Sequence, residues 1–329
     1  MKKQTTFKIF TLLSIVLIMT VLMQSCNKSE IVVINKLINR QEMNKSIVMT
    51  TTTITATGIN AIFKEMITDS SERAEFCQAY IENAKFFDDN SGYFFIETLD
   101  AWMVAHAIKP ELIGTNRINI QDENGKYYVQ DMVDFIEYTG YGFVNYYYLN
   151  PTTNKVSYKL AFVKSIPNAD WWIGSGFYGV SDPVYYEPQN VNKNIVKAVV
   201  KTTAGGIGGV NDGIFSDSLQ LVDFCRKFIK HIRFFDNQSG YFFIYDFDAN
   251  NVAHSTQPDL QGQNLYDYQD SHGNYVIRDM IDITKNNESG FYEYFWNNPT
   301  TGNEEQKLAF VKKIPGIDYF IGSGVYLNN

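Results

Sequence analysis

The hydrophobic pattern of the chain begins with helical spacing and then changes to strand spacing. Helical patterning covers residues 31–66 and 71–87, and Asp69 offers a carboxylate that can cap the second helix. Short apolar runs bounded by Asn, Gly and Pro then predict strands, and an amphipathic helix at 129–138 interrupts them. The predicted strands lie at 93–96, 102–107, 142–149, 155–166 and 171–178. Helices followed by a mostly antiparallel sheet predict an α+β domain.

The second half of the chain repeats the pattern of the first half. Residues 44–178 recur at 192–326 with a constant offset of 148 and without insertion or deletion. The unit is much longer than the repeats of solenoids and propellers, so we interpret it as a duplicated domain. The sequence therefore predicts a first domain at 44–181, a Pro-containing linker at 182–191 and a second domain at 192–329. A feature proposed for one copy can be checked at the equivalent position of the other.

The first residues have the composition of an export signal. Basic residues precede an apolar run at 9–23, and Ser25 and Cys26 follow it. This order is typical of a signal peptide, and Cys after a small residue resembles the lipobox of bacterial lipoproteins. We therefore predict a signal peptide at 1–25, lipidation of Cys26 and a tether at 26–43. The alternative is an uncleaved membrane anchor. Both place the chain in the cell envelope outside the cytoplasm, and we expect no later segment to cross a membrane.

Composition narrows the possible partners. The formal net charge of -8 argues against nucleic acid. Aromatic residues make up 15% of the chain, with 22 Tyr and 24 Phe. Because Tyr combines an apolar ring with a polar hydroxyl, this surplus suits ligand pockets as well as cores. Cys77 and Cys225 occupy equivalent positions in separate domains, so we expect two buried thiols rather than a disulfide.

Two ionisable positions are the same in both copies. His106 and His254 each end a predicted strand, where the imidazole could contact a ligand or fix the following loop by hydrogen bonds to its backbone. Lys159 and Lys307 lie in mid-strand on the same face as small apolar neighbours such as Ala161. A cation there could anchor a carboxylate ligand. Alternatively, the lysine stem could lie over the sheet with its ammonium group in water.

Other polar positions differ between the copies. Arg278 replaces Gln130 at the start of the short helix, and Arg117 is replaced by Leu265 in the second copy. A guanidinium group is suited to bidentate binding of a carboxylate. We therefore expect two pockets with different preferences, and we favour the second copy as the more selective because it adds Arg278 to the shared His and Lys. Tyrosines shared by the copies complete the candidate ligand-binding set: Tyr93, Tyr146, Tyr241 and Tyr294.

The sequence offers no constellation suited to catalysis. The chain has four His, none spaced as a pair of metal ligands, so we predict neither a catalytic zinc site nor another metal site. The Gly-rich run at 205–209 lacks the Lys-Ser/Thr of a phosphate loop, and Gly-Ser-Gly at 174–176 lies within a predicted strand rather than a nucleophile elbow. Residues 246–250 resemble the start of a calcium loop without its Gly and closing Glu. We predict no enzyme activity and no cofactor.

Each copy carries a characteristic order of motifs. Gly-Tyr-Phe-Phe-Ile at 92–96 precedes a strand ending in His106 and Pro-x-Leu-x-Gly-x-Asn at 110–116. Lys-Leu-Ala-Phe-Val-Lys at 159–164 then leads to Ile-Gly-Ser-Gly at 173–176. This order resembles that of Cache domains, the extracellular PAS-like sensors of bacterial chemoreceptors and histidine kinases. The resemblance implies two tandem PAS-like Cache domains that bind small molecules, often organic acids or amino acids, between the sheet and an overlying loop.

Together these observations predict an extracytoplasmic, sensor-type lipoprotein that recognises a small organic acid or an amino-acid-like ligand. Its expected partners are that ligand, the membrane through the lipid anchor, and a separate membrane signalling protein, because the sequence ends three residues after the second copy. The alternative is a structural or surface interaction module whose pockets no longer bind ligand. Open polar pockets would favour sensing, and pockets filled by their own side chains would favour the structural role.

Overall fold

The computed structural model describes residues 37–179, 184–211, 213–215 and 217–327. The predicted signal peptide, Cys26 and most of the predicted tether lie outside these residues. From Leu37 onward the chain forms one unit that contains both copies. All features described below belong to that unit.

Each copy contains the same series of elements. The first copy comprises α2 (Arg40–Glu65), α3 (Ser70–Asn83), β2 (Phe94–Thr98), β3 (Met103–His106), η1 (Pro110–Leu112), α4 (Tyr128–Thr139), β4 (Tyr141–Asn150), β5 (Lys155–Ile166) and β6 (Trp171–Tyr178). The second comprises α5 (Pro188–Asn211), α6 (Ser218–Lys230), β8 (Phe242–Asp246), β9 (Asn251–His254), η2 (Pro258–Leu260), α7 (Val276–Asn287), β10 (Ser289–Asn297), β11 (Glu304–Lys313) and β12 (Tyr319–Tyr326). A short ribbon joins β1 (Ile38–Asn39) to β7 (Tyr185–Tyr186). The predicted α+β organisation is confirmed.

Local sequence explains where several helices begin and end. Asp69 and Asp217 cap α3 and α6, each accepting two backbone N–H groups of the first turn. Gly140 ends α4 in the left-handed conformation, which glycine adopts readily. The helix predicted to reach residue 87 ends at Asn83 instead, because Phe86 leaves the helix and pairs with Gly92 across an isolated bridge. The α2 helix begins at Arg40, inside the segment assigned to the tether.

The two sheets have the same topology. The first has the strand order β3-β2-β6-β5-β4 and the second has β9-β8-β12-β11-β10, with antiparallel pairing throughout. Because β5 lies between β4 and β6, Lys159 is flanked by Tyr146 on one side and Tyr178 on the other. The equivalent Lys307 lies between Tyr294 and Tyr326. The register therefore gives each mid-strand lysine two tyrosine neighbours.

Each sheet separates two hydrophobic clusters. Along β5, Leu160 and Phe162 join the cluster beneath the long helices, whereas Ala161 and Val163 join the cluster beneath α4. This alternation is the period of a β-strand with two covered faces. Lys159 therefore points to the α4 face, and the predicted assignment of residues to the two strand faces is confirmed.

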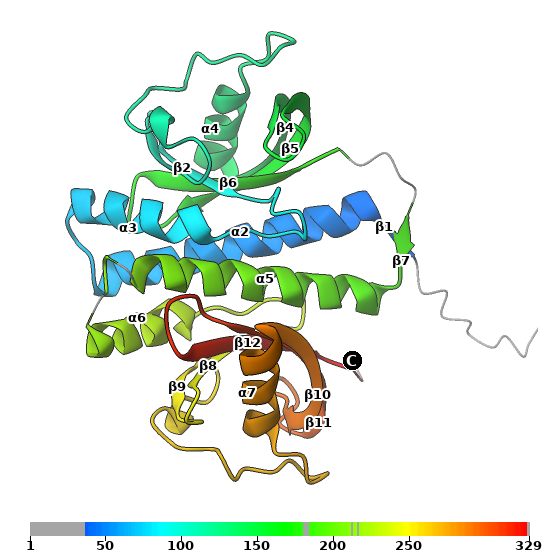
Figure 1. The fold of residues 1–329 in the computed structure, drawn as a ribbon. Helices are drawn as coiled ribbons and strands as arrows, with labels where there is room; N and C mark the ends of the chain where they lie inside the picture. The colour runs from blue at the N-terminus through cyan, green and yellow to red at the C-terminus, as the bar shows by residue number, and fades with distance from the viewer. Residues whose placement is uncertain (1–36, 180–183, 212, 216, 328–329) are drawn as a thin grey trace, which may run out of the picture. The chain divides into compact units, whose positions relative to one another are not determined.

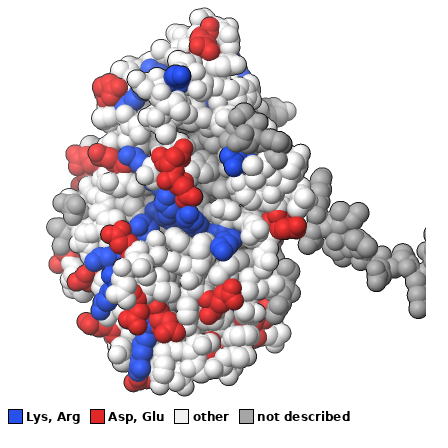
Figure 2. All heavy atoms as spheres, turned by 45° about the vertical axis from the view of Figure 1, so that its right-hand side comes forward, with Lys and Arg blue, Asp and Glu red and all other residues white. Residues whose placement is uncertain are grey.

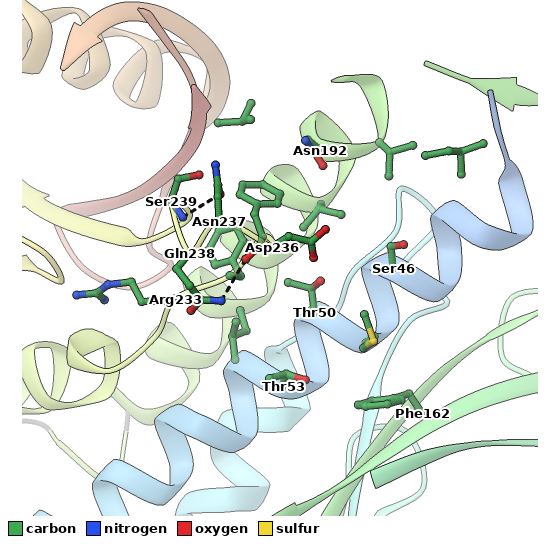
Figure 3. A pocket seen from close by; sticks show the side chains of 18 of the residues that line it. Ser46, Thr50, Thr53, Phe162, Asn192, Arg233, Asp236, Asn237, Gln238 and Ser239 are labelled. Atoms are coloured by element: carbon green, nitrogen blue, oxygen red, sulfur yellow. Dashed lines mark hydrogen bonds between the residues drawn. The ribbon is translucent and has the colours of Figure 1, made fainter. Parts of the chain in front are cut away.

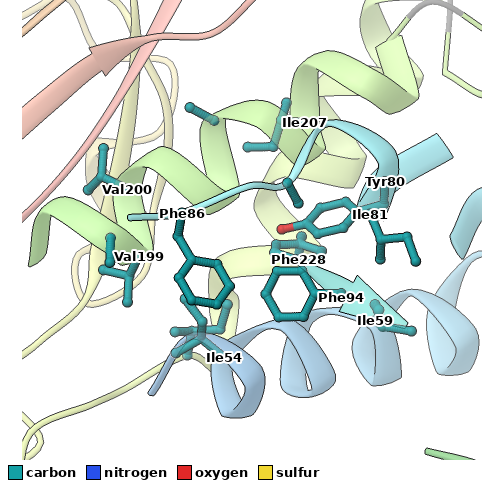
Figure 4. Packing of buried hydrophobic residues seen from close by; sticks show 14 of the residues in the cluster. Ile54, Ile59, Tyr80, Ile81, Phe86, Phe94, Val199, Val200, Ile207 and Phe228 are labelled. Atoms are coloured by element: carbon teal, nitrogen blue, oxygen red, sulfur yellow. The ribbon is translucent and has the colours of Figure 1, made fainter. Parts of the chain in front are cut away.

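The long helices of both copies pack together between the sheets (Figure 1). The α2 helix contacts β5 and β6 of its own copy as well as α5 and α6 of the other, and α5 contacts β11, β12 and α3. One hydrophobic cluster includes side chains from both copies. At its centre the rings of Tyr80 and Phe228 stack with centroids 5.0 Å apart, near Phe86 and Ile207 (Figure 4). The two copies thus share a core.

Glycines in the long helices allow this close packing. A Cβ at Gly58 would overlap the ring of Phe228, and a Cβ at Gly206 would overlap the ring of Tyr80. Gly58 and Gly206 are equivalent positions, as are Tyr80 and Phe228, so the contact is repeated symmetrically. The Gly-rich run at 205–209 therefore serves helix packing.

Two further expectations concern burial. Cys77 and Cys225 are free and buried, as predicted, and burial raises the pKa of both thiols, that of Cys225 to about 12. By length and composition α2 is long and apolar enough to cross a membrane, contrary to expectation. However, 67% of its most apolar window is buried in the fold, as in the core helix of a soluble domain.

The face of the molecule shown in Figure 2 carries charges of both signs. A patch of Lys and Arg side chains lies next to Asp and Glu side chains.

Candidate functional site

The ammonium group of Lys159 lies in the interior of the first copy. The side chain is 1% exposed, and Nζ donates a hydrogen bond of 2.8 Å to the hydroxyl of Tyr93 and lies 4.0 Å from the centroid of that ring. The rings of Tyr146 and Tyr178 lie 5.9 and 5.3 Å away. No carboxylate forms a salt bridge with Lys159 among the described residues. The cation is surrounded by aromatic rings and lacks a counter-ion.

A glycine makes room for this lysine. A Cβ at Gly176, on the neighbouring strand, would lie 2.8 Å from Cε of Lys159. Gly324 has the same relation to Lys307, at the same distance. The Gly-Ser-Gly motif within a strand therefore accommodates a buried lysine stem, a role that the sequence pattern did not indicate.

A chain of hydrogen bonds continues from Lys159. The hydroxyl of Tyr178 donates to the carbonyl of Leu149 at 2.7 Å and lies 3.3 Å from the hydroxyl of Tyr93. Since Tyr178 uses its proton on that carbonyl, Tyr93 donates to Tyr178 and accepts from Lys159. Lys159 is thus the first donor in a row of hydrogen bonds that ends at a backbone carbonyl, and no anion takes part in this row.

A small cavity lies beside the ammonium group. Its volume is about 20 Å³, and it lies between the sheet and the loop that leads to α4. A cavity holds one water when about 10–15 Å³ is accessible to the water centre. The residues that line it are Tyr93, Phe95, Glu97, Met103, His106, Arg117, Tyr128, Tyr146, Tyr148 and Lys159. This set includes all five candidate residues predicted in the first copy.

Burial sets the charges around the cavity. It lowers the pKa of Lys159 to about 7, with a smaller effect from Lys109. It raises the pKa of Glu97 to about 8 against the opposing effect of Arg117. It also lowers the pKa of His106 to about 3, together with Lys159. Near neutral pH the imidazole is uncharged, the Glu97 carboxyl is mainly protonated and Lys159 is near its titration midpoint.

His106 both lines the cavity and orders the next loop. Its Nδ1 accepts backbone N–H groups of Ile108 and Lys109 at 3.2 and 3.0 Å. A neutral imidazole that accepts at Nδ1 carries its proton on Nε2, which remains available as a donor. His254 repeats this contact by accepting the N–H of Gln257 at 3.0 Å. The two alternatives considered for these histidines are therefore compatible.

The equivalent cavity in the second copy is smaller and more apolar. Its volume is about 10 Å³, and its lining is Phe243, Tyr245, His254, Val276, Ile277, Met280, Tyr294 and Trp296. Lys307 is fully buried, and its Nζ has no hydrogen-bond partner among the described residues but lies 3.8 Å from the ring centroid of Tyr241. Burial lowers its pKa well below the usual value. Where the first copy has Glu97 and Arg117, the second has Tyr245 and Leu265.

Comparison with protein families agrees with this architecture. Residues 37–182 match the model described as single Cache domain 2, and residues 221–329 match a second model described as Cache domain. The chain contains two tandem Cache domains. Such domains are extracytoplasmic sensor and ligand-binding modules rather than catalytic ones, so the cavities described above lie in two sensor-type domains.

Curated relatives are longer proteins that share part of this chain. The sensor histidine kinase MctS of Rhizobium johnstonii is 38% identical over 92 residues, which cover 28% of this chain and 20% of MctS. The methyl-accepting chemotaxis protein McpP of Pseudomonas putida is 27% identical over 93 residues, covering 28% of this chain and 17% of McpP. The matched stretch thus spans about a fifth of the length of these relatives.

Two solved structures are also similar to this chain in sequence. A methyl-accepting chemotaxis protein from Vibrio parahaemolyticus is 29% identical and covers 42% of this chain and 90% of that chain, with a TM-score of 0.37. A structure described as showing carboxylic acid recognition by a Cache chemosensory domain is 28% identical, covers 40% of this chain and 91% of its own, and has a TM-score of 0.36.

In the second Cache domain the predicted site residues do not all come together. Tyr294 and His254 line the cavity, and Lys307 and Tyr241 adjoin it. Arg278, however, lies outside the lining: its Nε donates to the carbonyl of Tyr266 and its Nη2 pairs with Asp267. Because Ile277 and Met280 occupy the inner face of α7, Arg278 turns away from the cavity. The expectation that Arg278 joins His254 and Lys307 is therefore corrected.

Sequence reasoning missed several residues around the first cavity. Glu97, Tyr128 and Tyr148, which line the cavity, and Tyr178, which adjoins Lys159, were not among the candidates. Glu97 is a carboxylate in a strand of aromatic residues, which is a detectable signal. The stacking of Tyr128 on Tyr146, with centroids 4.3 Å apart, depends on tertiary packing. Arg117 donates to the hydroxyl of Tyr128 at 3.2 Å.

The described residues contain no group of three or more His, Cys, Asp or Glu side chains placed to hold a metal ion. The segment that resembles the start of a calcium loop uses its first carboxylate locally. Asp246 accepts the N–H groups of Asp248 and Asn250 at 3.0 and 2.8 Å. Its oxygens thus stabilise the turn between β8 and β9.

Proposed function

We propose that the first Cache domain is the sensing domain and that it binds a small carboxylate next to Lys159. The observation that carries this proposal is a buried ammonium group that has hydroxyl neighbours and a cavity but no counter-ion. A buried charge is stable only when it is paired and hydrogen-bonded. A bound carboxylate would supply the missing negative charge.

Other groups around the cavity suit the same ligand class. The Nε2–H of His106, the protonated carboxyl of Glu97 and the guanidinium of Arg117 are donors on three different elements. A carboxylate has about four lone-pair directions and can accept from several donors at once. The aromatic rings of the lining would contact a short alkyl chain.

The size of the cavity limits the ligand. A volume of about 20 Å³ is close to the space needed for one or two waters. The cavity is thus nearly filled by its own side chains, a feature that by itself favours the structural role, so binding of a short-chain carboxylate requires a shift of the loop that carries Arg117. We infer that binding stabilises an expanded arrangement of this loop, as a ligand does when it binds one of two conformations better.

For the second Cache domain we propose the structural role. Its cavity of about 10 Å³ lacks the two charged positions of the first, and it is lined mainly by apolar side chains. Its long helix α5 completes the shared core between the sheets. In this proposal the second domain supports the first, which reverses the earlier preference for the second pocket because that preference relied on Arg278.

Binding is tested by calorimetry and thermal shift with acetate, propionate, lactate and pyruvate, using the matching amides as uncharged controls. A ligand at a hundredfold excess over Kd adds roughly 2.7 kcal/mol of stability. Lys159→Met should weaken carboxylate binding by at least about thirtyfold, because loss of one partner of a buried charged pair costs about 2–5 kcal/mol. Lys307→Met is the matched control and should leave the affinity unchanged. Equal binding by wild type and Lys159→Met would exclude the proposed anchor.

The same proposal includes the location and the partner of the chain. The order of basic, apolar and small residues before Cys26 supports lipidation at that residue and attachment to the cell envelope. The ligand-bound state would then be recognised by a separate membrane signalling protein. Labelling with an alkyne fatty acid should modify the full chain and should fail in Cys26→Ala; modification of Cys26→Ala would contradict this assignment.

A further inference from the structure

A cleft outside both Cache pockets lies between the two domains. Its volume is about 740 Å³, and it is lined by α2, the start of α5, strands β4 and β5, and the loop after α6. Figure 3 shows Thr50 and Thr53 of α2 across from Asp236 of that loop. The cleft is far larger than either Cache cavity, and neither Lys159 nor Lys307 lines it, although Tyr326 of β12 borders both the cleft and Lys307.

Because the domain is duplicated, the molecule has a second cleft built from equivalent residues, and the two linings can be compared position by position. A cleft of about 280 Å³ lies on the other side of the α2–α5 pair. Every residue that lines it except Arg40 has its equivalent, 148 positions away, in the lining of the larger cleft. Two of these pairs exchange a lysine for an uncharged residue, Lys197 for Met49 and Lys201 for Thr53, and two pairs keep the acceptors, Asp88 with Asp236 and Phe87 with Phe235.

In the smaller cleft the protein's own lysines occupy the acceptors. Nζ of Lys197 lies 2.6 Å from a carboxylate oxygen of Asp88, and Nζ of Lys201 donates to the carbonyl of Phe87 at 2.6 Å. Lys197 and Lys201 lie one helical turn apart on α5, so both ammonium groups reach the same loop. The loop therefore presents one carboxylate and one carbonyl to two ammonium groups.

The larger cleft keeps these acceptors but lacks both ammonium groups. Met49 and Thr53 stand at the lysine positions, and no described side chain donates to the carboxylate of Asp236. Among the described residues the carbonyl of Phe235 accepts from Gln238, through its backbone N–H at 3.0 Å and its side-chain amide at 3.2 Å, so a ligand must displace the weaker of these two bonds.

The two cationic side chains that line the larger cleft, Arg233 and Lys164, do not pair with Asp236. Arg233 points away from Asp236 in Figure 3, and its guanidinium donates to the carbonyls of Ile232 and Ser255. Nζ of Lys164 lies 5.4 Å from the ring centroid of Tyr141. The equivalent lysine, Lys312, does not line the smaller cleft but lies close enough to Lys201 to lower its pKa, so a lysine at this position is compatible with ammonium groups in the cleft.

We propose that the larger cleft binds an aliphatic primary amine or diamine. Its first ammonium group pairs with Asp236, as Nζ of Lys197 pairs with Asp88 in the smaller cleft. Its second takes the place of Lys201 Nζ at the carbonyl of Phe235, where it must displace the side-chain amide of Gln238. Its alkyl chain lies where the lysine stems would lie, against Met49 and Ile195. This site is independent of the carboxylate pocket proposed for the first domain.

The test is calorimetry of the folded chain with 1,4-diaminobutane, and with 1,4-butanediol and tetramethylammonium as controls that lack the N–H donors. Wild type should bind the diamine alone. The double variant Met49→Lys/Thr53→Lys copies the smaller cleft and should lose binding. Asp236→Asn, at an exposed position, should weaken binding by about fivefold. Lys197→Met/Lys201→Thr opens the smaller cleft and should raise the stoichiometry from one to two.

Absence of diamine binding by wild type would overturn the proposal. So would unchanged affinity in both Met49→Lys/Thr53→Lys and Asp236→Asn, with circular dichroism and thermal unfolding verifying that the variants are folded. Lys159→Met separates the two proposals, because it removes carboxylate binding and should leave the affinity for 1,4-diaminobutane unchanged.

Discussion

The two domains hold a lysine at the same place and give it different surroundings. Lys159 and Lys307 lie on equivalent strands, and each has a glycine on the next strand that makes room for its stem. Lys159 reaches the hydroxyl of Tyr93, whereas Nζ of Lys307 lies over the ring of Tyr241 and has no hydrogen bond among the described residues. The shared backbone fixes the position of the lysine, and the side chains around it decide what the lysine can bind.

Two substitutions account for most of the difference in polarity. Glu97 and Arg117 bring a titratable carboxyl and a guanidinium to the first cavity, and Tyr245 and Leu265 remove them from the second. The row of hydrogen bonds from one tyrosine hydroxyl to another and on to a backbone carbonyl is kept in the second domain. Tyr241 and Tyr326 have hydroxyls 3.3 Å apart, and that of Tyr326 donates to the carbonyl of Asn297 at 2.7 Å. A duplicated domain can therefore keep the scaffold of a cavity while it loses the ionisable groups that line it.

The largest expected effect on stability is at Lys307. Leaving a buried donor unsatisfied costs about 1–3 kcal/mol, so Lys307→Met should raise the free energy of unfolding near pH 7 by about that amount. Lys159→Met should give a smaller gain, because it also removes the partner of the Tyr93 hydroxyl. Urea unfolding of both variants measures the difference. A loss of stability in Lys307→Met would show that the buried amine is a stabilising group.

The same substitution should change how stability depends on pH. The folded protein lowers the pKa of Lys307 well below its usual 10.5, so between that lowered pKa and 10.5 the unfolded chain binds more protons. The burial of Lys307 therefore destabilises the fold most below its lowered pKa, and this penalty shrinks as pH rises across the window and vanishes above it. Lys307→Met should show a shallower rise in stability from about pH 7 to about pH 10 than wild type.

The next largest effect concerns the shared helical core. Gly206→Ala places a methyl group in the ring of Tyr80, and Gly58→Ala does the same at Phe228. Overpacking of a core costs about 1–3 kcal/mol, which exceeds the helix propensity gained by alanine. Because the contacts are equivalent, the two losses should be similar. Gly213→Ala, where no atom lies near the new methyl group, is the control. A twofold or larger difference between the two losses would contradict a symmetric core.

Sequence patterning predicted the architecture well because it depends on local signals. Strand alternation placed Leu160 and Phe162 on one face and Lys159 on the other, and Asp69 marked the start of a helix. Because the sequence repeats with a constant offset, each element predicted in the first copy was also predicted at the equivalent position in the second. His106, Arg117, Tyr146 and the other first-domain candidates line one cavity, because strand ends and the following loop meet there, and their role in ligand binding stays a prediction.

The remaining features depend on tertiary geometry that no local pattern encodes. Arg278 sits one residue from Ile277, and only the orientation of α7 decides which of the two faces the cavity. The contact of Gly206 with Tyr80 joins residues of different domains, so a run of glycines in a helix gave no indication of its partner. Cavity volumes of about 20 and 10 Å³ likewise follow from how neighbouring rings stack.

A smaller effect, in the first domain only, is the pH dependence of carboxylate binding. In the free protein the pKa of Lys159 is about 7, so binding an anion requires proton uptake above that pH. Affinity should be constant below about pH 7, while the ligand is ionised, and should then fall by up to about tenfold per pH unit. Ionisation of Glu97, with a pKa of about 8, adds to the loss. Calorimetry in buffers of different ionisation enthalpy measures the proton uptake; pH-independent affinity would contradict this linkage.

The smallest expected effect on stability concerns a buried pair of hydroxyl groups that the first domain has and the second lacks. Thr52 of α2 and Ser175 of β6 lie 2.7 Å apart, whereas Val200 replaces Thr52 in the second copy and Ser323 donates to the carbonyl of Tyr241 instead. In Thr52→Val, Ser175 can rotate to the carbonyl of Tyr93 as Ser323 does, so the loss of stability should be about 0.5–1 kcal/mol rather than the full cost of an unsatisfied hydroxyl. The double variant Thr52→Val/Ser175→Ala tests this rotation. If Ser175 finds the new acceptor, its removal costs further stability, and if it stays unpaired, its removal restores stability.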